Sequence, residues 1–490
     1  MLLGELTSKL DIITANADMG AVIGGVCFDT RRLKQGDLFV AVRGYRSDGH
    51  DFIGSALEKG AACVICESEP AEDVAYVLVK DSRAALADVS AAWFGYPASK
   101  IKVIGVTGTN GKTTVTSLVK QVLETLTGKK AGLIGTNGNM IGDTVLHTER
   151  TTPESYEVQE LLADMAAAGC EYAVMEVTSH ALYLERVRGI EFEVGLFTNL
   201  SQDHLDFHDS LEEYAKIKAR LFSNSRKSAI NADDEYASLM AENAEGSVIT
   251  YSAKDDRADL VAKKIELHED RVGFCALTIG NLNRVELAIP GMISVYNALS
   301  AISAAILLGF DIADVAAAIK SCKGVKGRAE VVHTGGDFTV LIDYAHTPDA
   351  LASIISTVRG FARGRVITLF GCGGDRDSKK RPLMGQIAAQ LSDYVFVTSD
   401  NPRTENPAAI IENILAGMKD TATIYEVIEN RREAIYKALD TCSTGDVLIL
   451  AGKGHETYQI IGTEKRDFDE RDVVSDYFRY ERGQHSGSKL

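Results

Sequence analysis

The chain contains 490 residues, of which 45% are hydrophobic and 25% charged, and its formal net charge is −17. This composition is that of an ordinary folded protein rather than a disordered or fibrous one. At roughly 150 residues per domain, the length predicts about three domains. The negative charge argues against nucleic acid or an anionic membrane as a partner, because both select surfaces rich in Lys and Arg. We therefore expect any anionic ligand to be bound by local groups.

No segment predicts export or insertion into a membrane. Residues 1–11 contain two carboxylates and lack the basic flank and uninterrupted apolar stretch of a signal peptide. The most apolar region, residues 295–319, contains Asn297, Asp311 and Asp314, which favours packed helices over a membrane span. We expect a cytoplasmic protein that makes no membrane contact and acts as a monomer.

The eight cysteines have no regular spacing, which is typical of reduced thiols in a chain of this length. Cys63 and Cys66 form a C-x-x-C pair within the apolar run 61–66. Because no second pair completes a zinc site, we interpret both as buried strand residues that act as small hydrophobes. Redox chemistry at this pair is the alternative.

Two turn-rich segments mark the expected domain boundaries. Residues 95–99 precede the apolar run 101–106, which predicts the first buried strand of a new domain. Residues 323–328 contain two glycines and three cations and separate an Ala-rich helical stretch from new strand-like segments. We predict an N-terminal domain at residues 1–98, a central domain at 99–328 and a C-terminal domain at 329–490.

The order of apolar runs predicts an α/β fold. In the central domain, strand-like runs such as 172–177 and 194–199 alternate with amphipathic stretches such as 211–222, which indicates a largely parallel sheet of the P-loop ATPase kind. The C-terminal domain repeats this alternation, and we predict a doubly wound, Rossmann-like sheet there. Its expected strands are residues 339–342, 366–370, 394–398 and 447–450.

A glycine-rich loop follows the first strand of the central domain and precedes an amphipathic helix that reaches residue 126. Glycines let backbone N–H groups surround phosphate oxygens, the helix start adds partial positive charge, and Lys112 can reach the terminal phosphates. Thr113 can hold Mg²⁺ through its hydroxyl.

The generic phosphate-loop spacing G-x-x-x-x-G-K-[ST] fails by one residue, because Val106 stands where it requires glycine. A plain glycine turn is the alternative to nucleotide binding. We predict ATP or GTP binding by Gly108, Thr109, Asn110, Gly111, Lys112, Thr113 and Thr114.

The shortened loop at residues 108–113 resembles that of the Mur ligases and their folylpolyglutamate synthetase relatives. Further segments narrow the resemblance to Mur ligases of the MurE type, and they follow the expected order along the whole chain. These segments are residues 29–31, 36–41, 151–153, 176–180, 203–206, 343–348 and 400–403.

The resemblance implies an ATP-dependent ligase of peptidoglycan precursor synthesis. Members of this type add the third amino acid to UDP-N-acetylmuramoyl-L-alanyl-D-glutamate. The substrate carboxylate attacks the γ-phosphate of ATP to give an acyl phosphate, which the incoming amine converts to an amide. Both steps bring anions together, so the site needs cationic groups that neutralise repulsion and hold the reactants in line. Mg²⁺ is the implied metal, and ATP is a co-substrate.

Glu176 and His204 join Lys112 and Thr113 as implied residues of the catalytic centre. Glu176 ends an apolar run, where a carboxylate beyond a parallel strand can reach a nucleotide-bound Mg²⁺ together with Thr113. His204 is implied by the resemblance to bind a second Mg²⁺. An ordinary histidine in a polar loop is the alternative for His204.

The resemblance implies that Lys218 is catalytic, although the residue pattern of the helix around it does not indicate such a role. On the expected helix 211–222, Lys216, Lys218 and Arg220 would ordinarily be solvated cations. The position of Lys218 resembles that of the lysine that is carbamylated in this family. The resemblance therefore implies a CO₂-derived carbamate on Lys218, an anion that helps to bind the second Mg²⁺.

Further ATP and UDP-substrate contacts are implied by the resemblance alone. Domain closure is expected to bring some of the ATP contacts to the nucleotide. A helix-start hydrogen bond is the alternative for Asn297, and a surface position is the alternative for Arg328. Thr178 replaces a serine that is frequent in the family but keeps the hydroxyl. The implied ATP contacts are Asn297, Arg328, Asp343 and His346. The implied contacts of the UDP-N-acetylmuramoyl dipeptide are Thr30, Thr151, Thr152, Thr178 and Arg186, whose hydroxyls and guanidinium suit carboxylate and amide oxygens.

The choice of amino acid is implied to depend on residues 400–403. meso-Diaminopimelate differs from L-lysine by a carboxylate on its far carbon, which a guanidinium can bind through two hydrogen bonds. Arg403 is therefore interpreted as the selector, and Glu456 as the partner of the distal ammonium. A proline turn with a surface arginine is the alternative. The implied diaminopimelate pocket contains Arg376, Asp400, Asn401, Pro402, Arg403, Gly452 and Glu456.

Two other functions compete with a diaminopimelate-adding ligase. One is the L-lysine-adding ligase of the same family, which Arg403 disfavours. The other is a switch protein that hydrolyses a nucleotide without making a bond, which would need neither the pocket with Arg376 and Arg403 nor the segment at residues 29–31.

Overall fold

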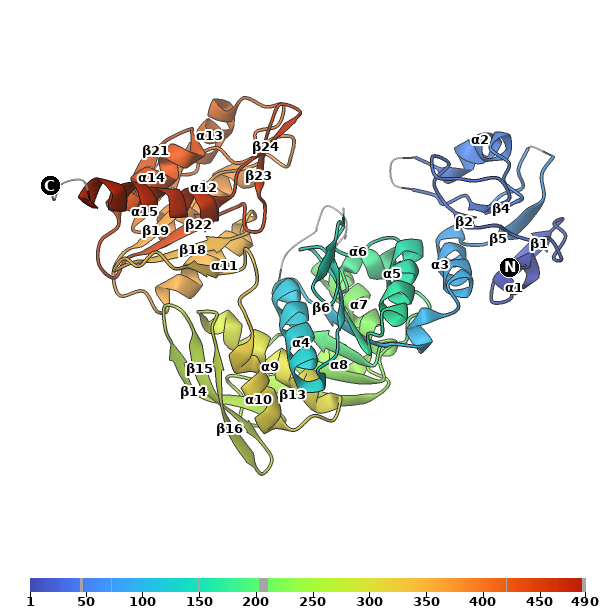
Figure 1. The fold of residues 1–490 in the computed structure, drawn as a ribbon, viewed down its shortest axis with the longest axis horizontal. Helices are drawn as coiled ribbons and strands as arrows, with labels where there is room; N and C mark the ends of the chain where they lie inside the picture. Colours follow the sequence, from blue (N-terminus) through green and yellow to red (C-terminus); the bar gives the residue numbers. More distant parts are fainter. Residues whose placement is uncertain (45–46, 72, 149, 202–209, 420, 487–490) are drawn as a thin grey trace. The chain divides into compact units, whose positions relative to one another are not determined.

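The protein is described by a computed structural model that covers residues 1–44, 47–71, 73–148, 150–201, 210–419 and 421–486 (Figure 1). It divides into two compact units. The first unit consists of Met1–Tyr251, Arg257–Asp259 and Ser300–Asp311, and the second of Ser252–Asp256, Leu260–Leu299 and Ile312–Leu490. The domain boundaries predicted at residues 98 and 328 stay predictions. Within the described ranges, no helix combines the length and the apolar character that a membrane span requires.

The first sheet of the first unit has helices on both faces. Its strands, in order across the sheet, are β1 (Ile12–Ala15), β5 (Tyr76–Val79), β4 (Cys63–Cys66), β3 (Leu38–Val40) and β2 (Val26–Cys27). β1 is antiparallel to β5, and the other pairs are parallel. Because side chains alternate along a strand, one face packs against α3 (Ser82–Trp93) and the other against α2 (Ile53–Glu58). Short helices α1 (Leu3–Leu6), η1 (Gly49–Phe52) and η2 (Pro97–Ser99) complete this region.

The second sheet of the first unit is mainly parallel and includes the strand that leads into the glycine-rich loop. β13, β12, β11, β6, β10 and β7 run parallel as neighbours in that order, and β8 and β9 extend the β7 edge antiparallel. Their bounds are β6 (Lys102–Thr107), β7 (Gly132–Ile134), β8 (Asn139–Ile141), β9 (Thr144–Leu146), β10 (Tyr172–Glu176), β11 (Val194–Phe197), β12 (Lys227–Asn231) and β13 (Ser247–Ser252). The carboxyl ends of parallel neighbours meet at one edge of a sheet, which brings the ends of β6, β10 and β11 together.

Local signals explain where the helices of this region begin and end. α4 (Lys112–Thr127) starts directly after Gly111 and stops at Gly128, whose left-handed backbone lets its N–H donate to the Glu124 carbonyl. α7 (Leu211–Ser223) starts after Ser210, whose hydroxyl accepts the Glu213 N–H. The remaining helices are α5 (Ser155–Ala167), α6 (Ser179–Tyr183) and α8 (Ala237–Glu242). The predicted parallel strands and the helices predicted at 112–126 and 211–222 are therefore confirmed.

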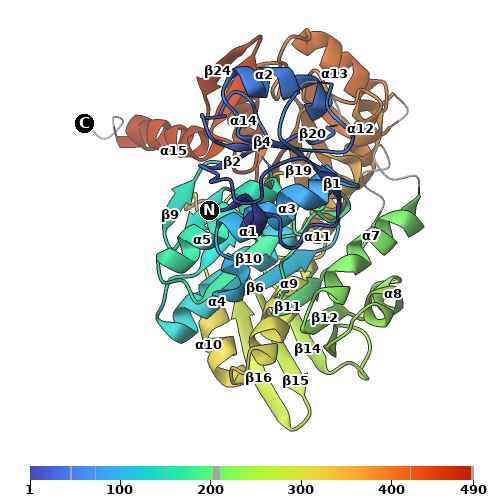
Figure 2. The ribbon, with the colours of Figure 1, turned by 90° about the vertical axis from the view of Figure 1, so that its right-hand side faces the viewer.

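The second unit begins with three antiparallel strands, β14 (Leu260–Leu267), β15 (Val272–Thr278) and β16 (Asn281–Leu287). α10 (Ile312–Ser321) packs against β16 (Figure 2). The Ala-rich region predicted to be packed helices forms α10 and α9 (Met292–Leu307), and α9 starts in the second unit and ends in the first.

The last sheet is doubly wound, as predicted. Its order is β17-β18-β22-β19-β20-β21, with β17 antiparallel and the rest parallel. α14 (Arg431–Thr441) and α15 (Glu470–Ser486) cover one face, and α11 (Pro348–Arg359) and α12 (Lys380–Leu391) contact the same strands (Figure 1). The other elements are β17 (Glu330–Val332), β18 (Thr339–Asp343), β19 (Val366–Phe370), β20 (Tyr394–Val397), α13 (Pro407–Leu415), β21 (Ile424–Val427), β22 (Val447–Ala451) and the hairpin of β23 (Tyr458–Ile461) and β24 (Glu464–Asp467).

Cys63 and Cys66 occupy the two ends of β4 and are buried, as predicted. Cys63 belongs to the apolar cluster under α3, whereas Cys66 belongs to the cluster under α2. Three residue steps along the strand separate their Cα atoms by ~10 Å, while a disulfide requires less than about 7 Å. The strand geometry therefore excludes a disulfide between them and disfavours the redox alternative.

We predict that both thiols resist alkylation in the folded protein. Burial raises the pKa of Cys63 to about 12 and that of Cys66 to about 11, so almost no thiolate is present at pH 7.5. Iodoacetamide treatment at pH 7.5 followed by peptide mass spectrometry should find both residues unmodified. The urea-unfolded protein is the control and should be modified at both. Rapid modification of either thiol in the folded protein would contradict the assignment.

Candidate active site

The glycine-rich loop connects the end of β6 to the start of α4, the strand–loop–helix arrangement expected for a phosphate site. Gly108 has φ +145° and Gly111 has φ +88°, conformations that side chains disfavour. A Cβ atom on Gly108 would lie 1.9 Å from the hydroxyl oxygen of Thr198, so only glycine fits there. The Lys112 ammonium donates to the carbonyls of Gly108 and Thr109, each at 2.8 Å, and so lies against the loop.

Residues after β11 hold this loop in shape. The Thr198 hydroxyl donates to the Asn110 carbonyl at 2.6 Å. Asn199 accepts the Asn110 N–H through its side chain at 2.9 Å, and its own carbonyl accepts the Thr109 N–H at 2.8 Å. Neither Thr198 nor Asn199 was among the site residues predicted from the sequence. Both lay inside the apolar run 194–199 that the sequence predicted as a strand, whereas β11 ends at Phe197, so the sequence pattern did not separate them from the strand.

Glu176 lies at the end of β10 and is 1% exposed, and its carboxylate connects three segments. Its Oε2 accepts the Thr113 hydroxyl at 3.1 Å and the Thr136 hydroxyl at 3.1 Å, while Oε1 accepts the Thr136 N–H at 2.8 Å. The predicted pair of Thr113 and Glu176 is thus in contact. Thr136, which follows β7, was not identified from the sequence.

Lys218 is buried, with 1% of its surface exposed, although the helix pattern alone indicated a solvated cation. Its ammonium donates to the Gly108 carbonyl at 2.9 Å and lies 3.5 Å from the Thr107 hydroxyl. It also lies 4.5 Å from the centre of the Tyr214 ring. Lys216 and Arg220 on the same helix are exposed, as that pattern indicated. The Lys218 side chain on α7 is therefore buried against the glycine-rich loop.

The predicted substrate residues of the central region gather beside Glu176. The Thr152 hydroxyl donates to the Glu176 carbonyl at 2.7 Å and lies 3.4 Å from the Thr178 hydroxyl. The Thr151 hydroxyl lies 3.0 Å from that of Thr136. The Arg186 guanidinium donates to the Thr152 carbonyl at 3.1 Å. These residues place hydroxyl groups and one guanidinium next to the carboxylate of the nucleotide site.

A cavity of about 780 Å³ in the first unit is lined by Thr30, by Arg186 and other charged residues, and by apolar residues such as Phe28 and Leu184. The Glu154 carboxylate in its wall lies 2.8 Å from Arg186, 2.9 Å from Arg150 and 3.7 Å from Arg83. Burial lowers the pKa of Arg186, and Glu154 opposes that shift. The Nε atom of Arg186 makes no hydrogen bond within the described part of the chain. Three guanidiniums around one carboxylate give the cavity the positive charge that an anionic substrate needs.

The ATP contacts predicted beyond the loop lie in the second unit. Asn297 is buried in α9. The Asp343 carboxylate ends β18 and accepts the backbone N–H groups of Ala329 and Ala345 at 2.7 and 2.9 Å. Arg328 lies over the Tyr344 ring, 5.2 Å from its centre.

The Tyr344 ring is flanked by two histidines. The His346 ring is 4.5 Å from it, and the His455 ring is 4.8 Å from it. Burial lowers the pKa of His455 to about 4, and nearby cations, Arg328 first among them, add to this shift. His455 is therefore neutral at pH 7. Its loop, residues 452–456, lies beside the Asp343 strand end, because the Gly452 N–H donates to the Asp343 carbonyl at 3.0 Å.

Lys453 is the buried centre of the predicted amine pocket and was not among the residues predicted from the sequence. Its ammonium is fully buried and lies 3.1 Å from the Asn401 side-chain oxygen, 3.1 Å from Glu456 and 3.9 Å from Asp400. The Asn401 amide donates to the same Glu456 oxygen at 2.9 Å. Gly452 has φ +112°, a conformation that favours glycine, and a Cβ atom there would also lie 2.7 Å from an Asp400 side-chain oxygen. The predicted partners Asp400, Asn401, Gly452 and Glu456 are thus brought together.

Arg403 follows Pro402 at this strand edge in a left-handed conformation, with φ +50°. Such a conformation costs an L-residue roughly 1–3 kcal/mol and is retained where the surroundings hold it. The β23–β24 hairpin supplies this support, because the Arg403 N–H donates to the Ile460 carbonyl and the Gly462 N–H donates to the Arg403 carbonyl. The Arg403 guanidinium donates to the Gly374 carbonyl at 2.7 Å, and the exposed Arg376 follows in the same loop.

His204 lies outside the described residues, as do all of residues 202–209. In the described part of the chain, no group of three or more His, Cys, Asp or Glu side chains has the geometry of a metal site. The hydroxyl of Thr113 and the carboxylate of Glu176 nevertheless fit Mg²⁺, which prefers oxygen ligands and commonly combines one or two protein ligands with substrate phosphates.

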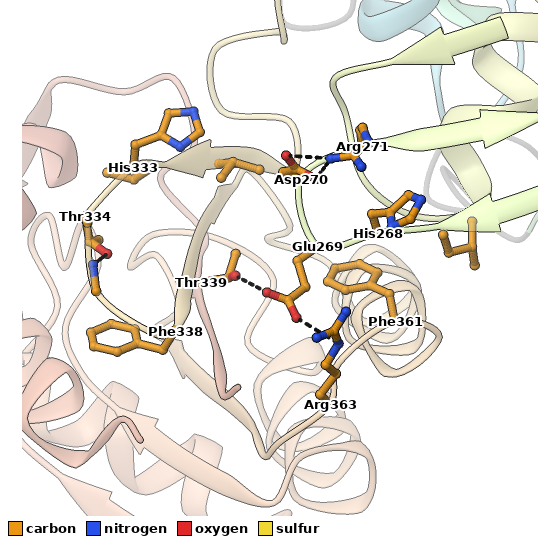
Figure 3. Close-up of a pocket in the computed structure, with 15 residues that line it drawn as sticks. His268, Glu269, Asp270, Arg271, His333, Thr334, Phe338, Thr339, Phe361 and Arg363 are labelled. Carbon is orange, nitrogen blue, oxygen red and sulfur yellow. Dashed lines mark hydrogen bonds and ion pairs between the residues drawn. The ribbon is translucent and has the colours of Figure 1, made fainter. Parts of the chain in front are cut away.

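A further cavity of about 510 Å³ in the second unit lies apart from the predicted site residues (Figure 3). Glu269 in its wall accepts the Thr339 hydroxyl at 3.1 Å and lies 3.6 Å from the Arg363 guanidinium. Arg271 donates to the neighbouring Asp270 at 3.0 Å. Because these charged side chains pair with each other, we interpret the cavity as a packing gap between turns and not as a ligand site.

Comparison with known proteins identifies the family of the chain. Three family models match consecutive segments: "Mur ligase family, catalytic domain" at residues 22–94, "Mur ligase middle domain" at 106–305, and "Mur ligase, glutamate ligase domain" at 327–454. A UDP-N-acetylmuramoyl-L-alanyl-D-glutamate–2,6-diaminopimelate ligase of Caldanaerobacter subterraneus is 49% identical over 457 residues, which cover 93% of this chain and 94% of that protein. A ligase of the same kind from Clostridium acetobutylicum is 46% identical over 94% of this chain and 96% of its own.

Solved structures agree with these matches. The structure of a UDP-N-acetylmuramoyl-L-alanyl-D-glutamate–2,6-diaminopimelate ligase has 31% sequence identity and a TM-score of 0.74, and the match covers 98% of this chain and 99% of the other. MurF from Acinetobacter baumannii has 18% identity and a TM-score of 0.64 over 98% of both chains, which indicates a shared fold. On this evidence, the chain belongs to the Mur ligase family.

Proposed function

We propose that this protein is the ATP-dependent ligase that joins meso-2,6-diaminopimelate to UDP-N-acetylmuramoyl-L-alanyl-D-glutamate, releasing ADP and phosphate, in peptidoglycan precursor synthesis. The observation that carries the proposal is Arg403, which donates to the Gly374 carbonyl at the carboxyl edge of the last sheet, two residues after Asn401, which contacts both Lys453 and Glu456. The names of the most similar relatives support it. We place the reaction in the cytoplasm, where its ATP is made.

The nucleotide loop is proposed to bind ATP. Its backbone N–H groups and the start of α4 would receive the phosphates, and Lys112 would leave the Gly108 and Thr109 carbonyls to contact the terminal ones. Thr113 and Glu176 would hold a Mg²⁺ ion, which supplies positive charge against the phosphate oxygens. Asn297, Arg328, Asp343 and His346 are proposed as further nucleotide contacts.

The muramoyl substrate is proposed to occupy the cavity lined by Thr30 and Arg186. Arg186 connects this cavity to Thr152, and Thr152 connects it to Glu176 of the nucleotide site. A carboxylate bound along this path would reach the γ-phosphate and form the acyl phosphate. The hydroxyls of Thr151, Thr152 and Thr178 would orient that carboxylate through hydrogen bonds.

Lys218 is proposed to carry a carbamate that helps to bind a second Mg²⁺, together with His204. The burial of Lys218 next to the loop supports this role, because an unmodified ammonium there adds no metal ligand, whereas a carbamate adds oxygens. Its neighbour Lys216 is exposed and has no such role.

Arg403 is proposed to select the amine. Its guanidinium can bind the distal carboxylate of diaminopimelate through two hydrogen bonds, and L-lysine would leave the guanidinium without that partner. Arg376, exposed in the neighbouring loop, would assist. Lys453 and Asn401 already hold the Glu456 carboxylate through hydrogen bonds. We therefore propose that this carboxylate binds the distal ammonium of diaminopimelate in the position it already occupies.

The proposal predicts amine-dependent phosphate release. Protein supplied with ATP, Mg²⁺ and UDP-N-acetylmuramoyl-L-alanyl-D-glutamate should release phosphate with meso-diaminopimelate, much less with L-lysine, and very little without an amine. A coupled phosphate assay with product mass spectrometry measures this. A preference for L-lysine would favour the lysine-adding ligase, and full-rate release without an amine would favour a nucleotide-dependent switch.

We expect Arg403→Ala to raise the KM for meso-diaminopimelate by about 10- to 100-fold, because a charge-assisted hydrogen bond contributes about 1.5–3 kcal/mol. The KM for ATP should change little. Alanine keeps a Cβ atom at the left-handed position, so the backbone cost stays similar. Arg363→Ala, whose side chain is 83% exposed, is the matched control. An unchanged KM for diaminopimelate would refute the selector role.

We expect Lys218→Ala to lower kcat by about 100-fold or more, the usual loss when a group that stabilises transition-state charge is removed. Short carboxylates such as formate or acetate should restore part of the activity by replacing the carbamate. Lys216→Ala, two residues away and exposed, should retain wild-type activity. Labelling of the wild-type protein with ¹³C-bicarbonate should give a carbamate signal that Lys218→Ala lacks. Full activity of Lys218→Ala without added carboxylate would disprove the role.

A further inference from the structure

Arg431 and Glu470 form a fully enclosed ion pair in the C-terminal sheet region. Their side chains are 0% and 1% exposed, and the closest nitrogen–oxygen distance is 2.8 Å. Arg431 is the first residue of α14, and Glu470 is the first residue of α15. Neither residue belongs to the proposed nucleotide, muramoyl or amine contacts.

The remaining N–H groups of Arg431 reach the ends of two strands. Nη2 donates to the carbonyl of Ala451, the last residue of β22, at 2.8 Å. Nη1 lies 3.4 Å from the carbonyl of Ser399, two residues after the end of β20. The next residues in the chain are Gly452 and Asp400, which begin the two loops of the proposed amine pocket. One guanidinium thus connects the starting points of both loops.

Neighbouring residues reinforce these contacts. The Glu429 carbonyl accepts the Ser399 N–H at 3.1 Å, which ties the segment before α14 to the same strand end. Arg471, the residue after Glu470, donates to the Gly454 carbonyl at 3.0 Å and pairs with Glu330. The starts of α14 and α15 therefore contact the chain at Ala451 and Gly454, at the beginning and in the middle of this segment.

Stability alone does not account for such a pair. Burying two charges costs desolvation energy that their attraction only partly returns, and apolar replacements of similar volume are often as stable. An arginine, however, has five donors in a rigid planar arrangement, which fixes the relative positions of several acceptors. Arg431 has three such acceptors here, namely Glu470 and two strand-end carbonyls.

We propose that Arg431 and Glu470 are positioning residues for the amine pocket, which set the spacing between the 400–403 loop and the 452–456 loop. The proposal rests on the proposed function, because the pocket is that of diaminopimelate. Glu470 orients the guanidinium, the guanidinium holds the Ala451 and Ser399 carbonyls, and these carbonyls place Lys453 against Asn401 and Glu456. The pair touches no substrate and acts through the two loops.

The test replaces both charges together, with Arg431→Met and Glu470→Met in the full-length protein. Since no charge remains buried without its partner, the double variant should fold with a melting temperature near that of the wild type. Its KM for meso-diaminopimelate should rise about tenfold, the equivalent of one lost charge-assisted hydrogen bond, while the KM values for ATP and the muramoyl substrate stay within about twofold. The single variant Arg431→Lys should fall between wild type and double variant.

Arg365→Met provides a matched control at the opposite edge of the same sheet. Arg365 lies before β19, pairs with Asp446 at 2.7 Å and donates to the Thr441 carbonyl at 2.7 Å. Its loss should lower the melting temperature and leave the KM for diaminopimelate unchanged. If Arg365→Met raised that KM as much as the double variant did, or if the double variant left it unchanged, the positioning role would be overturned.

Hydrogen–deuterium exchange separates this proposal from the proposed function. In protein without substrate, the double variant should exchange faster in peptides that cover residues 399–404 and 451–456, and Arg365→Met should not. If wild-type protein used no amine, the proposed function would fail while the exchange result would still decide the positioning role. Unchanged exchange in both peptides would overturn that role whatever the activity.

Discussion

The nucleotide site depends on the carboxylate of Glu176. This buried group accepts hydrogen bonds from Thr113 at the start of α4 and from both the hydroxyl and the N–H of Thr136 after β7. A buried carboxylate without such donors would be costly, so these contacts determine where the three segments meet. The same carboxylate is thereby presented beside the phosphate loop, where oxygen ligands for Mg²⁺ are needed.

The chain as a whole is acidic, yet each proposed anion site contains its own cations. Lys112 lies against the loop carbonyls, and three arginines surround Glu154 in the muramoyl cavity. Each of these cations already has an oxygen partner in the protein. A bound phosphate can replace the carbonyl partners of Lys112, so the cost of desolvating that ammonium has largely been met before binding.

The charges of the proposed amine pocket also have partners within the protein, but here two carboxylates share one buried ammonium. Asp400 and Glu456 lie on either side of the buried Lys453, which limits their repulsion. Arg403 is held in an unfavourable backbone conformation by the β23–β24 hairpin, and this conformation presents its guanidinium to the loop after β19. Strain of this kind is typical of sites where the direction of one side chain decides which ligand binds.

The sequence by itself determined the class of fold and the order of the apolar runs that form the parallel strands. It also determined the phosphate loop and the family segments along the chain. These features are local, because strand, helix and glycine patterns follow from neighbouring residues. Only the tertiary structure decided which residues of distant segments meet. The burial of Lys218, the support of the loop by Asn199, and the central position of Lys453 depend on packing between elements. A lysine on an amphipathic helix has the same local pattern whether it is solvated or buried, so no local signal could distinguish Lys218 from Lys216.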